Sequence, residues 1–528
     1  MSGLTRRAAL GVLGTAAAAG VGVPLGQNLV SASDSTGVLR SSGLPLPQRF
    51  ARPLPIPRVL APSSTDATTD YYEITAREAS VELVPGVRTA IWGYEGTFPG
   101  PTLVSRSGRR TVVRHRNELA VPEVVHLHGG HTPAEHDGYP TDLLLPRGMA
   151  VPPPAMSGMD MPGMTNPDPR AVIARDVREY VYPLNQRATT LWYHDHRMGF
   201  TGPGVWRGLF GLHLVRDDEE DALGLPTGER DLPLMITDRA FAADGSLRYP
   251  ALDPTGLHTP GVSGDFGAGV LGDVILVNGA PWPVAEVAPA TYRLRLLNAS
   301  NARRYRLALR PGPAGGNGFA QIGTEGGLLA APIHHDSIDI APAQRYDVLV
   351  DFGRFAPGQE VTLANLFGTG ATADVMRFRV TGGTRDSMPV PARLSDVESL
   401  DPARARVTRE FNLRNWKRQG RPEWRISGRG FDPARAEATP RLGDVEVWRL
   451  VSDFHHPVHL HLAHFQVVSR DGRDPGPFDH GWKDTIDLLP NQPAEIVMRF
   501  DDYRGRFVFH CHNLEHEDMA MMSTMVVS

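Results

Sequence analysis

Short segments rich in Val, Ile, Leu, Thr and Tyr recur along most of the chain, each bounded by Gly, Pro or Asp. Examples are YYEITAREASVELVPG at 71–86, TYRLRLLNAS at 291–300 and RGRFVFH at 504–510. Such segments predict strands joined by tight turns, and few stretches have the 3.6-residue period of an amphipathic helix. With 55 glycines and 46 prolines among 528 residues, the pattern predicts an all-β protein of sandwiches or barrels with short helices.

Two segments have the composition of linkers and divide the chain into parts of similar length. They are VRDDEEDALGLPTGERDLP at 215–233 and TGGTRDSMPVPARL at 381–394. A chain of this length is expected to form three to four domains of about 150 residues. We therefore predict domains at 70–220, 221–385 and 386–528, preceded by an irregular lead-in at 34–69 that is rich in Pro, Ser and Thr.

The N-terminus has the features of an export signal. Arg6 and Arg7 precede an uncharged run, rich in Ala and Gly, that extends from Ala8 to about Leu25, and residues 5–10 resemble a twin-arginine signal. The alternative, a membrane anchor, is disfavoured because the run is short and poor in Leu, Ile and Phe. We predict that residues 1–33 engage the twin-arginine export machinery, that no stable membrane insertion follows processing, and that the protein is extracellular, in the cell envelope or periplasmic.

Charge and cysteine content exclude some functions. The net charge of −5 is mild for this length, so no nucleic-acid partner is expected. The chain has one cysteine, Cys511, which cannot form a disulfide within the chain. Its thiol is therefore free for another role.

Half of the twenty histidines fall in four tight groups. The groups are HLHGG (His126, His128), WYHDH (His194, His196), HPVHLH (His456, His459, His461) and HCHNLEH (His510, His512, His516). A single His-x-His pair more often represents two hydrogen-bonded histidines on a half-buried strand. Four groups on predicted strands indicate metal binding, because imidazole is a common metal ligand.

Strand geometry sorts these ligands into two sites. Alternate side chains of a strand share a face, so His510 and His512 point one way and Cys511 points the other. By the same rule His459 and His461 share a face, and His456 takes the opposite face if the strand continues through Pro457. The sequence predicts two metal sites that meet at Cys511.

The first site would contain Cys511, His456, His516 and Met521. Two imidazoles, a thiolate and a long axial thioether form a blue-copper site, which transfers single electrons. Structural zinc is the alternative, but zinc usually recruits more cysteines and has no redox chemistry. The other eight histidines suit a cluster of about three copper ions. Together the two sites could hold the four electrons that reduce dioxygen to two waters.

At these residues the sequence resembles the multicopper oxidase family, with the four motifs in the family's order and spacing. HLHGGHTPAEHDGYP, LWYHDH, HPVHLHLAHFQ and HCHNLEHEDMAMM are most similar to its three-domain bacterial branch, which includes spore-coat laccase, bilirubin oxidase and phenoxazinone synthase. The resemblance implies three cupredoxin-like Greek-key β-sandwich or barrel domains. It also implies a copper-dependent oxidoreductase that couples one-electron oxidation of phenolic or aromatic amine substrates to reduction of dioxygen to water.

The resemblance assigns four copper ions to twelve residues. Type 1 copper, in the third domain, takes His456, Cys511, His516 and Met521. Type 2 copper takes His126 and His459. One type 3 copper takes His128, His194 and His512, and the other takes His196, His461 and His510, which places a trinuclear cluster between the first and third domains.

Two carboxylates match the family's acidic positions for proton delivery. They are Asp137, in EHDGYP, and Glu517, directly after His516. The alternatives are that Asp137 only caps a turn before Gly138 and that Glu517 is a solvated charge. Asp195, inside HDH, is a candidate to orient a histidine.

The reductant stays open in the sequence. Residues 146–170 contain Met149, Met156, Met159, Met161 and Met164 among Pro and Gly. This segment is either a flexible insertion or a site for Cu(I), which prefers thioethers, so a cuprous oxidase for copper resistance is the alternative function. Remote alternatives are a copper-binding or structural protein without turnover, which would not need the complete set of ligands.

Overall fold

The computed structural model describes residues 36–151, 168–418 and 421–528. The predicted signal at 1–33 lies outside the described residues, as do all methionines of the Met-rich segment except Met149. No helix in the described part of the chain is long and apolar enough to cross a membrane.

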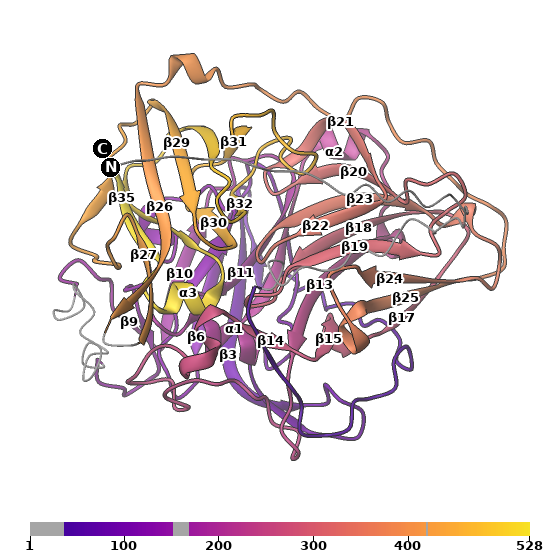
Figure 1. Cartoon of the computed structure of the whole chain (residues 1–528), viewed down its shortest axis with the longest axis horizontal. Coiled ribbons are helices and arrows are strands. Elements are labelled where there is room, and N and C mark those ends of the chain that lie inside the picture. Colours follow the sequence, from indigo (N-terminus) through magenta and orange to yellow (C-terminus); the bar gives the residue numbers. More distant parts are fainter. Residues whose placement is uncertain (1–35, 152–167, 419–420) are drawn as a thin grey trace, which may run out of the picture. The chain divides into compact units, whose positions relative to one another are not determined.

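Strands dominate the described chain, and they form three successive pairs of sheets that we call the first, second and third sandwich (Figure 1). The helices are short: α1 (Thr201–Arg207), α2 (Asp218–Ala222) and α3 (Leu514–Asp518). The prediction of an all-β protein with short helices is confirmed.

The first sandwich packs a seven-stranded sheet of order β2-β3-β6-β10-β9-β8, with β4 paired to β3, and a four-stranded sheet of order β5-β12-β11-β7. The strands of the larger sheet are β2 (Ser64–Thr65), β3 (Thr69–Val81), β4 (Thr89–Tyr94), β6 (Arg110–Asn117), β8 (Leu144–Leu145), β9 (Ala174–Arg175) and β10 (Val177–Tyr182). Those of the smaller sheet are β5 (Leu103–Arg106), β7 (Val125–His128), β11 (Thr189–Asp195) and β12 (Phe210–Arg216).

The second sandwich has a seven-stranded sheet of order β16-β15-β13-β18-β23-β20-β21 and a five-stranded sheet of order β17-β25-β24-β19-β22. The strands of the larger sheet are β13 (Asp231–Arg239), β15 (Val274–Val277), β16 (Ala280–Pro281), β18 (Thr291–Asn298), β20 (Phe319–Thr324), β21 (Gly327–His335) and β23 (Arg345–Asp351). Those of the smaller sheet are β17 (Val284–Val287), β19 (Tyr305–Arg310), β22 (Ser337–Ile340), β24 (Glu360–Asn365) and β25 (Asp374–Val380).

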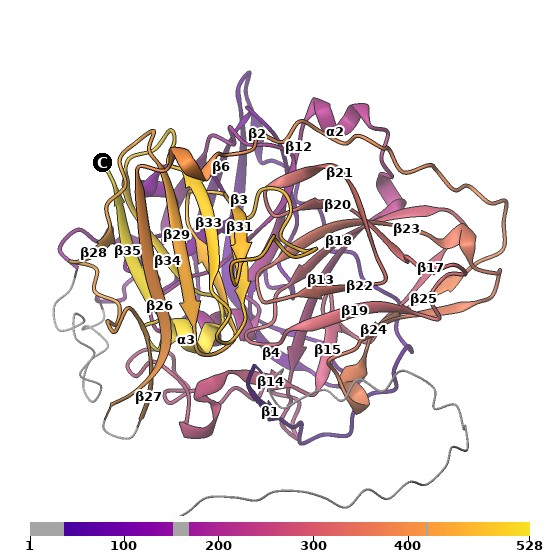
Figure 2. The same cartoon turned by 45° about the horizontal axis from the view of Figure 1, so that its top comes forward.

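The third sandwich has two five-stranded sheets, of order β27-β26-β29-β33-β31 and β28-β35-β34-β30-β32 (Figure 2). The strands of the first sheet are β26 (Val407–Arg418), β27 (Arg421–Ile426), β29 (Val445–Ser452), β31 (Phe465–Arg470) and β33 (Ala494–Arg499). Those of the second are β28 (Ala436–Ala438), β30 (His456–Leu460), β32 (Thr485–Leu488), β34 (Gly505–Cys511) and β35 (Met522–Val527).

The domain limits at 220/221 and 385/386 stay predictions, and both fall in segments between the strands of successive sandwiches. The lead-in at 34–69, expected to be irregular, contains β2 and also β1 (Val38–Arg40), which pairs in parallel with β14 (Val270–Gly272). Three residues are too few to show an alternating pattern, so the sequence carried no signal for β1.

Candidate metal centres

Antiparallel pairing brings the histidines of separate motifs together. In the first sandwich, β7 lies beside β11, and the register places His126 opposite His194. In the third sandwich, β30 lies beside β34, with His459 opposite His510 and Val458 opposite Cys511. Since alternate residues share a face, His456 lies on the face of Cys511, as the parity of the HPVHLH motif predicts.

The ligand atoms of these residues converge in several groups, and within each group all of them lie within 4.8 Å of one another. The groups are His126, His128 and His459; His128, His194 and His512; His196, His461 and His510; His456, Cys511 and His516; and His126, Asp137 and His461. Every member is buried. The histidine groups combine residues of the first and third sandwiches, whereas the cysteine group lies in the third alone.

The cysteine group is compact. His456 Nδ1 lies 3.3 Å from Cys511 Sγ and 3.1 Å from His516 Nδ1, and Sγ lies 3.6 Å from His516 Nδ1. Burial raises the pKa of the Cys511 thiol well above its usual range, so a thiolate here requires a bound cation.

This group is followed closely by Met519, Met521 and Met522. Met521 is fully buried, and its carbonyl accepts a hydrogen bond from the Cys511 backbone N–H at 3.0 Å. Met519 and Met522, for which the sequence suggested no role, are buried in two different core clusters. Their role is packing.

In five histidines of the larger centre the Nδ1–H group is held from outside. His510 donates to the Cys511 carbonyl at 3.2 Å. His126 donates to the Asp137 carbonyl at 2.6 Å, and His194 to the Asp195 carbonyl at 2.8 Å. His459 donates to the Asp484 carbonyl at 2.9 Å, and His461 to Asp137 Oδ2 at 2.6 Å. A neutral imidazole with its proton on Nδ1 presents its lone pair at Nε2.

The inward nitrogens fit metal ions. Nε2 of His196 lies 3.2 Å from Nε2 of both His461 and His510, and Nε2 of His126 lies 3.4 Å from that of His459. His194 Nε2 and both ring nitrogens of His512 make no hydrogen bond with any described residue. Buried acceptors without a donor are costly unless a cation binds them. Burial lowers the pKa of most of these histidines, which keeps them in the neutral form that ligates metals.

The two predicted acidic residues both contact this centre. Asp137 touches His126 and His461, as described above, and also ends the short 3-10 turn at 134–136. Glu517 Oε1 lies 3.3 Å from His196 Nδ1, and Oε2 lies 3.1 Å from His510 Nδ1. Burial raises the pKa of both carboxyls, so each can hold a proton. Glu517 is 1% exposed, so the alternative of a solvated charge is wrong.

Asp195 orients a histidine through its backbone, since the bond from His194 goes to its carbonyl. Its carboxylate instead accepts from the backbone N–H groups of Val124 and Arg197.

A cavity of about 360 Å³ lies against the outer side of the cysteine group. Its lining residues are Gly264, Asp265, Gly267, Ala268, Asn415, Trp424, Asp453 and Phe454. The Trp424 ring stacks on His516 with 3.6 Å between ring centroids, and His516 Nε2 donates to the Ala268 carbonyl at 3.1 Å. A small molecule in this cavity would lie next to His516. Sequence reasoning missed all of these lining residues, because they belong to three separate segments.

Comparisons with known proteins agree with this geometry. Two family profiles described as multicopper oxidase match residues 75–149 and 397–528. The chain is 35% identical to a laccase of Bacillus subtilis, over 91% of this chain and 99% of the relative. It is 34% identical to a bilirubin oxidase of Albifimbria verrucaria, over 90% of this chain and 80% of the relative.

Solved structures are similar over a comparable length. A laccase of Pediococcus acidilactici has a TM-score of 0.77 and 29% identity, covering 92% of this chain and 96% of the other. A laccase-like multicopper oxidase of Ochrobactrum sp. has a TM-score of 0.74 and 26% identity, covering 90% and 100%. The three sandwiches are cupredoxin-like domains, as predicted. With these similarities over nearly its whole length, the chain belongs to the multicopper oxidase family and is a copper-dependent oxidoreductase that uses oxygen as acceptor.

Proposed function

We propose that the protein is a laccase-like oxidase. It would remove single electrons from phenolic or aromatic amine substrates and use four of them, with four protons, to reduce one dioxygen to two waters. The observation that carries this proposal is the placement of His510, Cys511 and His512, which are consecutive residues belonging to three different ligand groups. The chain thereby connects a one-electron site to a multi-ion cluster through two peptide bonds.

We assign four copper ions to the groups described above. Type 1 copper would be held by His456, Cys511, His516 and Met521, and type 2 copper by His126 and His459. The type 3 ions would be held by His128, His194 and His512 and by His196, His461 and His510. Bound copper would supply the one-electron redox steps and the store of four electrons.

The surrounding residues would bind substrate, exclude water and supply protons. The cavity beside Trp424 would place an aromatic reductant next to His516. Asp137 and Glu517 would hold protons at the edge of the cluster, and Thr201 Oγ1, which donates to Glu517 Oε1 at 2.6 Å, would keep that carboxyl oriented.

Cu(I) is the second candidate reductant. Two carboxylates, Asp265 and Asp453, line the cavity, and no lysine or arginine is among its lining residues in the described chain. The two candidate reductants are distinguished by measuring oxygen uptake with Cu(I) and with a phenol, before and after deletion of residues 150–166. A Cu(I) activity that disappears on deletion would favour the cuprous oxidase, and its absence in the intact enzyme would exclude it.

Spectroscopy combined with oxygen uptake tests the proposed function. A copper-loaded sample should be blue, with an intense thiolate-to-copper absorption at ~600 nm, and should consume oxygen when a phenol is added. A copper-loaded sample that is colourless and consumes no oxygen would contradict it.

We also infer that residues 1–33 direct export by the twin-arginine machinery to an extracellular, cell-envelope or periplasmic location. The pair Arg6-Arg7 before an uncharged run supports this inference. Replacing both arginines with lysine should leave the full-length protein in the cytoplasm, and unchanged export of that variant would refute it.

A further inference from the structure

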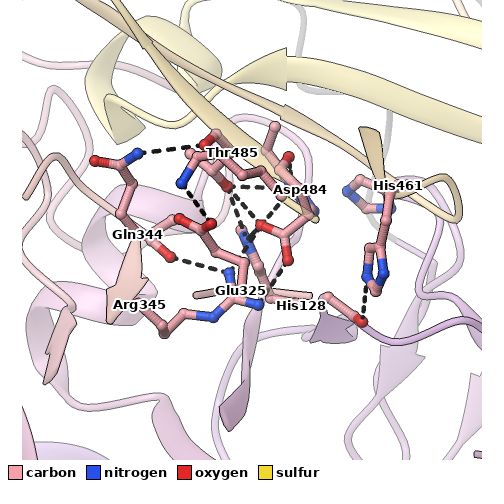
Figure 3. A network of polar contacts seen from close by, with 12 residues as sticks. His128, Glu325, Gln344, Arg345, His461, Asp484 and Thr485 are labelled. Carbon is pink, nitrogen blue, oxygen red and sulfur yellow. Dashed lines mark hydrogen bonds and ion pairs between the residues drawn. The ribbon is translucent and has the colours of Figure 1, made fainter. Parts of the chain in front are cut away.

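One histidine of the cluster has the opposite ring orientation to the five whose Nδ1 is held from outside. His128 Nε2 lies 3.1 Å from Asp484 Oδ1 and 3.2 Å from Thr485 Oγ1 (Figure 3). Its Nδ1 makes no hydrogen bond within the described residues. An ionised carboxylate only accepts hydrogen bonds, so Nε2 must carry the proton and Nδ1 the lone pair. His128 therefore offers Nδ1 to a metal. The five histidines whose Nδ1 is held from outside offer Nε2; they are His126, His194, His459, His461 and His510.

The residue that sets this orientation, Asp484, is itself held on both oxygens. Arg345 Nη1 donates to Oδ1 at 2.8 Å and Nη2 donates to Oδ2 at 2.6 Å, and Thr485 Oγ1 adds a third bond to Oδ1 at 2.8 Å. Arg345 and Asp484 are 1% and 0% exposed. A buried guanidinium that bonds both carboxylate oxygens leaves that carboxylate no freedom to rotate.

Arg345 belongs to β23 of the second sandwich, which contributes none of the assigned copper ligands. Its Nε donates to the Thr190 carbonyl at 2.9 Å, on the strand β11 that also carries His194. The guanidinium thus bonds two parts of the chain next to the cluster. One is β11 of the first sandwich, which carries His194. The other is Asp484 of the third, whose neighbour Thr485 pairs with His459 of β30.

The glycine that follows His128 fits the same arrangement. Gly129 has a φ of +81°, and a Cβ at this position would lie 2.4 Å from Arg345 Nη2 and 2.6 Å from Asp484 Oδ2. Only glycine allows the ion pair to approach the backbone beside His128 so closely.

We propose that Arg345 is a positioning residue for the copper cluster: it holds the Asp484 carboxylate so that the His128 ring presents Nδ1, and no other nitrogen, to the metal. This inference rests on the proposed copper assignment. It gives the second sandwich a part in building a centre whose ligands all come from the other two.

The competing explanation is that Arg345 and Asp484 form only a structural ion pair between sandwiches. The chain offers a matched control next to Asp484 in the sequence. Lys483 Nζ lies 2.6 Å from Glu325 Oε2, both side chains are 0% exposed, and the pair also joins the second and third sandwiches. Within the described chain, neither residue contacts an assigned copper ligand. Figure 3 shows Glu325 beside the Arg345–Asp484 pair.

The test compares Asp484→Asn, Arg345→Lys and Glu325→Gln in the full-length, copper-loaded protein. In Asp484→Asn, the amide NH₂ must face either Arg345 or His128. Facing Arg345, it would oppose the N–H donors of the guanidinium. Facing His128, it would donate to Nε2 and so favour the tautomer with a proton on Nδ1. Arg345→Lys keeps the charge but cannot bond both oxygens. A graded chelator is added while copper per chain, the electron paramagnetic resonance spectrum of the cluster copper and the blue absorption are recorded. Thermal unfolding of the copper-free variants reports structural damage.

We expect Asp484→Asn to release cluster copper at roughly 10- to 100-fold lower chelator concentration than the parent, with an altered cluster spectrum and an unchanged blue band. Arg345→Lys should shift in the same direction by less, and it decides the matter alone if Asp484→Asn does not fold. Glu325→Gln should lower the unfolding temperature of the copper-free chain but keep the parent's copper retention.

The inference would be overturned if Asp484→Asn retained as much copper as Glu325→Gln. If Asp484→Asn does not fold, the same comparison is made with Arg345→Lys. Either result would leave the proposed function intact. A parent protein that binds copper only at the blue site would contradict the proposed function itself, and this inference with it.

Discussion

Cys511 lies at a position where its thiol would ionise only beside a bound metal ion. The side chain is fully buried, and burial disfavours its ionised form. Its neighbours at hydrogen-bonding distance are His456, His516 and the backbone N–H of Asn513. A bound cation would stabilise the thiolate, and the thiolate in turn would select a soft ion such as copper.

Replacing Cys511 with serine separates the two centres. The Cys511→Ser variant should lose the blue absorption and nearly all oxidation of phenols, because the hard hydroxyl is a poor ligand for blue copper. Copper in the histidine cluster should remain, since none of its assigned ligands changes. Visible absorption and metal analysis check this, and full turnover by the colourless variant would refute the proposed link.

Glu517 tests proton supply at the same scale. The Glu517→Gln variant keeps the shape of the side chain but cannot release a proton, so the turnover number with a phenol should fall by roughly 10²- to 10⁴-fold. Reduction of the blue site by the phenol, followed without oxygen in a stopped-flow experiment, should be unchanged. An equal loss in both steps would mean that the substitution damages the site more generally.

Asp265 tests the reductant cavity. It is exposed at the cavity lining, so the Asp265→Asn variant should raise KM for a cationic aromatic amine by roughly two- to five-fold at low salt. The KM for a neutral phenol should not change, and added salt should reduce the difference. Glu78→Gln, at a separate cavity beside Trp92, is the matched control. A similar effect from both variants would indicate a general charge effect instead of a local one.

At the scale of elements, β34 and α3 explain how residues 510–517 serve two centres. Alternation along β34 turns His510 and Cys511 to opposite faces. The chain then forms the single turn of α3, which returns His516 to the Cys511 side and brings Glu517 to His196 and His510. The short length of α3 is thus part of the geometry of the site.

The turn after β7 gives a prediction at this scale. Gly129→Ala should destabilise the copper-free protein more than Gly86→Ala, although both glycines have positive φ. The strained backbone costs about 1–2 kcal/mol in each case, but a Cβ at Gly86 meets nothing within 4 Å. The overlap with Arg345 and Asp484 should add about 1–3 kcal/mol. Denaturant unfolding measures both variants, and equal losses would contradict the close approach of the ion pair.

At the scale of the whole molecule, the ligand groups divide unequally among the sandwiches. The cysteine group lies within the third sandwich, whereas the histidine groups join the first and third. Copper in the cluster would therefore cross-link two parts of the chain that are far apart in sequence, and blue copper would not.

Removing copper tests this difference. Chelation of all copper should lower the midpoint of thermal unfolding, because a ligand that binds only the folded state stabilises it. At a free ligand concentration of 1,000 times Kd this stabilisation is about 4 kcal/mol. The Cys511→Ser variant, loaded with cluster copper, should retain most of that stabilisation. Calorimetry of the loaded and copper-free forms measures both, and a variant as unstable as the copper-free parent would contradict the cross-link.

Much of the site could be predicted from sequence because its rules are local. Alternation along the strands predicted which histidines share a face with His510 and which with Cys511. The four motifs and their spacing indicated the multicopper oxidase family. The strand β1 was not predicted because it is three residues long. The packing roles of Met519 and Met522 were not predicted because a core contact depends on residues that are distant in the sequence.

The sequence by itself determined the strand content, the two-faced character of HCH and the chemistry of the ligands, since each depends on residues within a few positions. Only the tertiary structure decided that His128 presents Nδ1, because Asp484 lies 356 positions away from it and is held by Arg345, another 139 positions from Asp484. A buried carboxylate must find its donors somewhere, but desolvation does not specify where in the chain they lie. Folding alone brings such partners together.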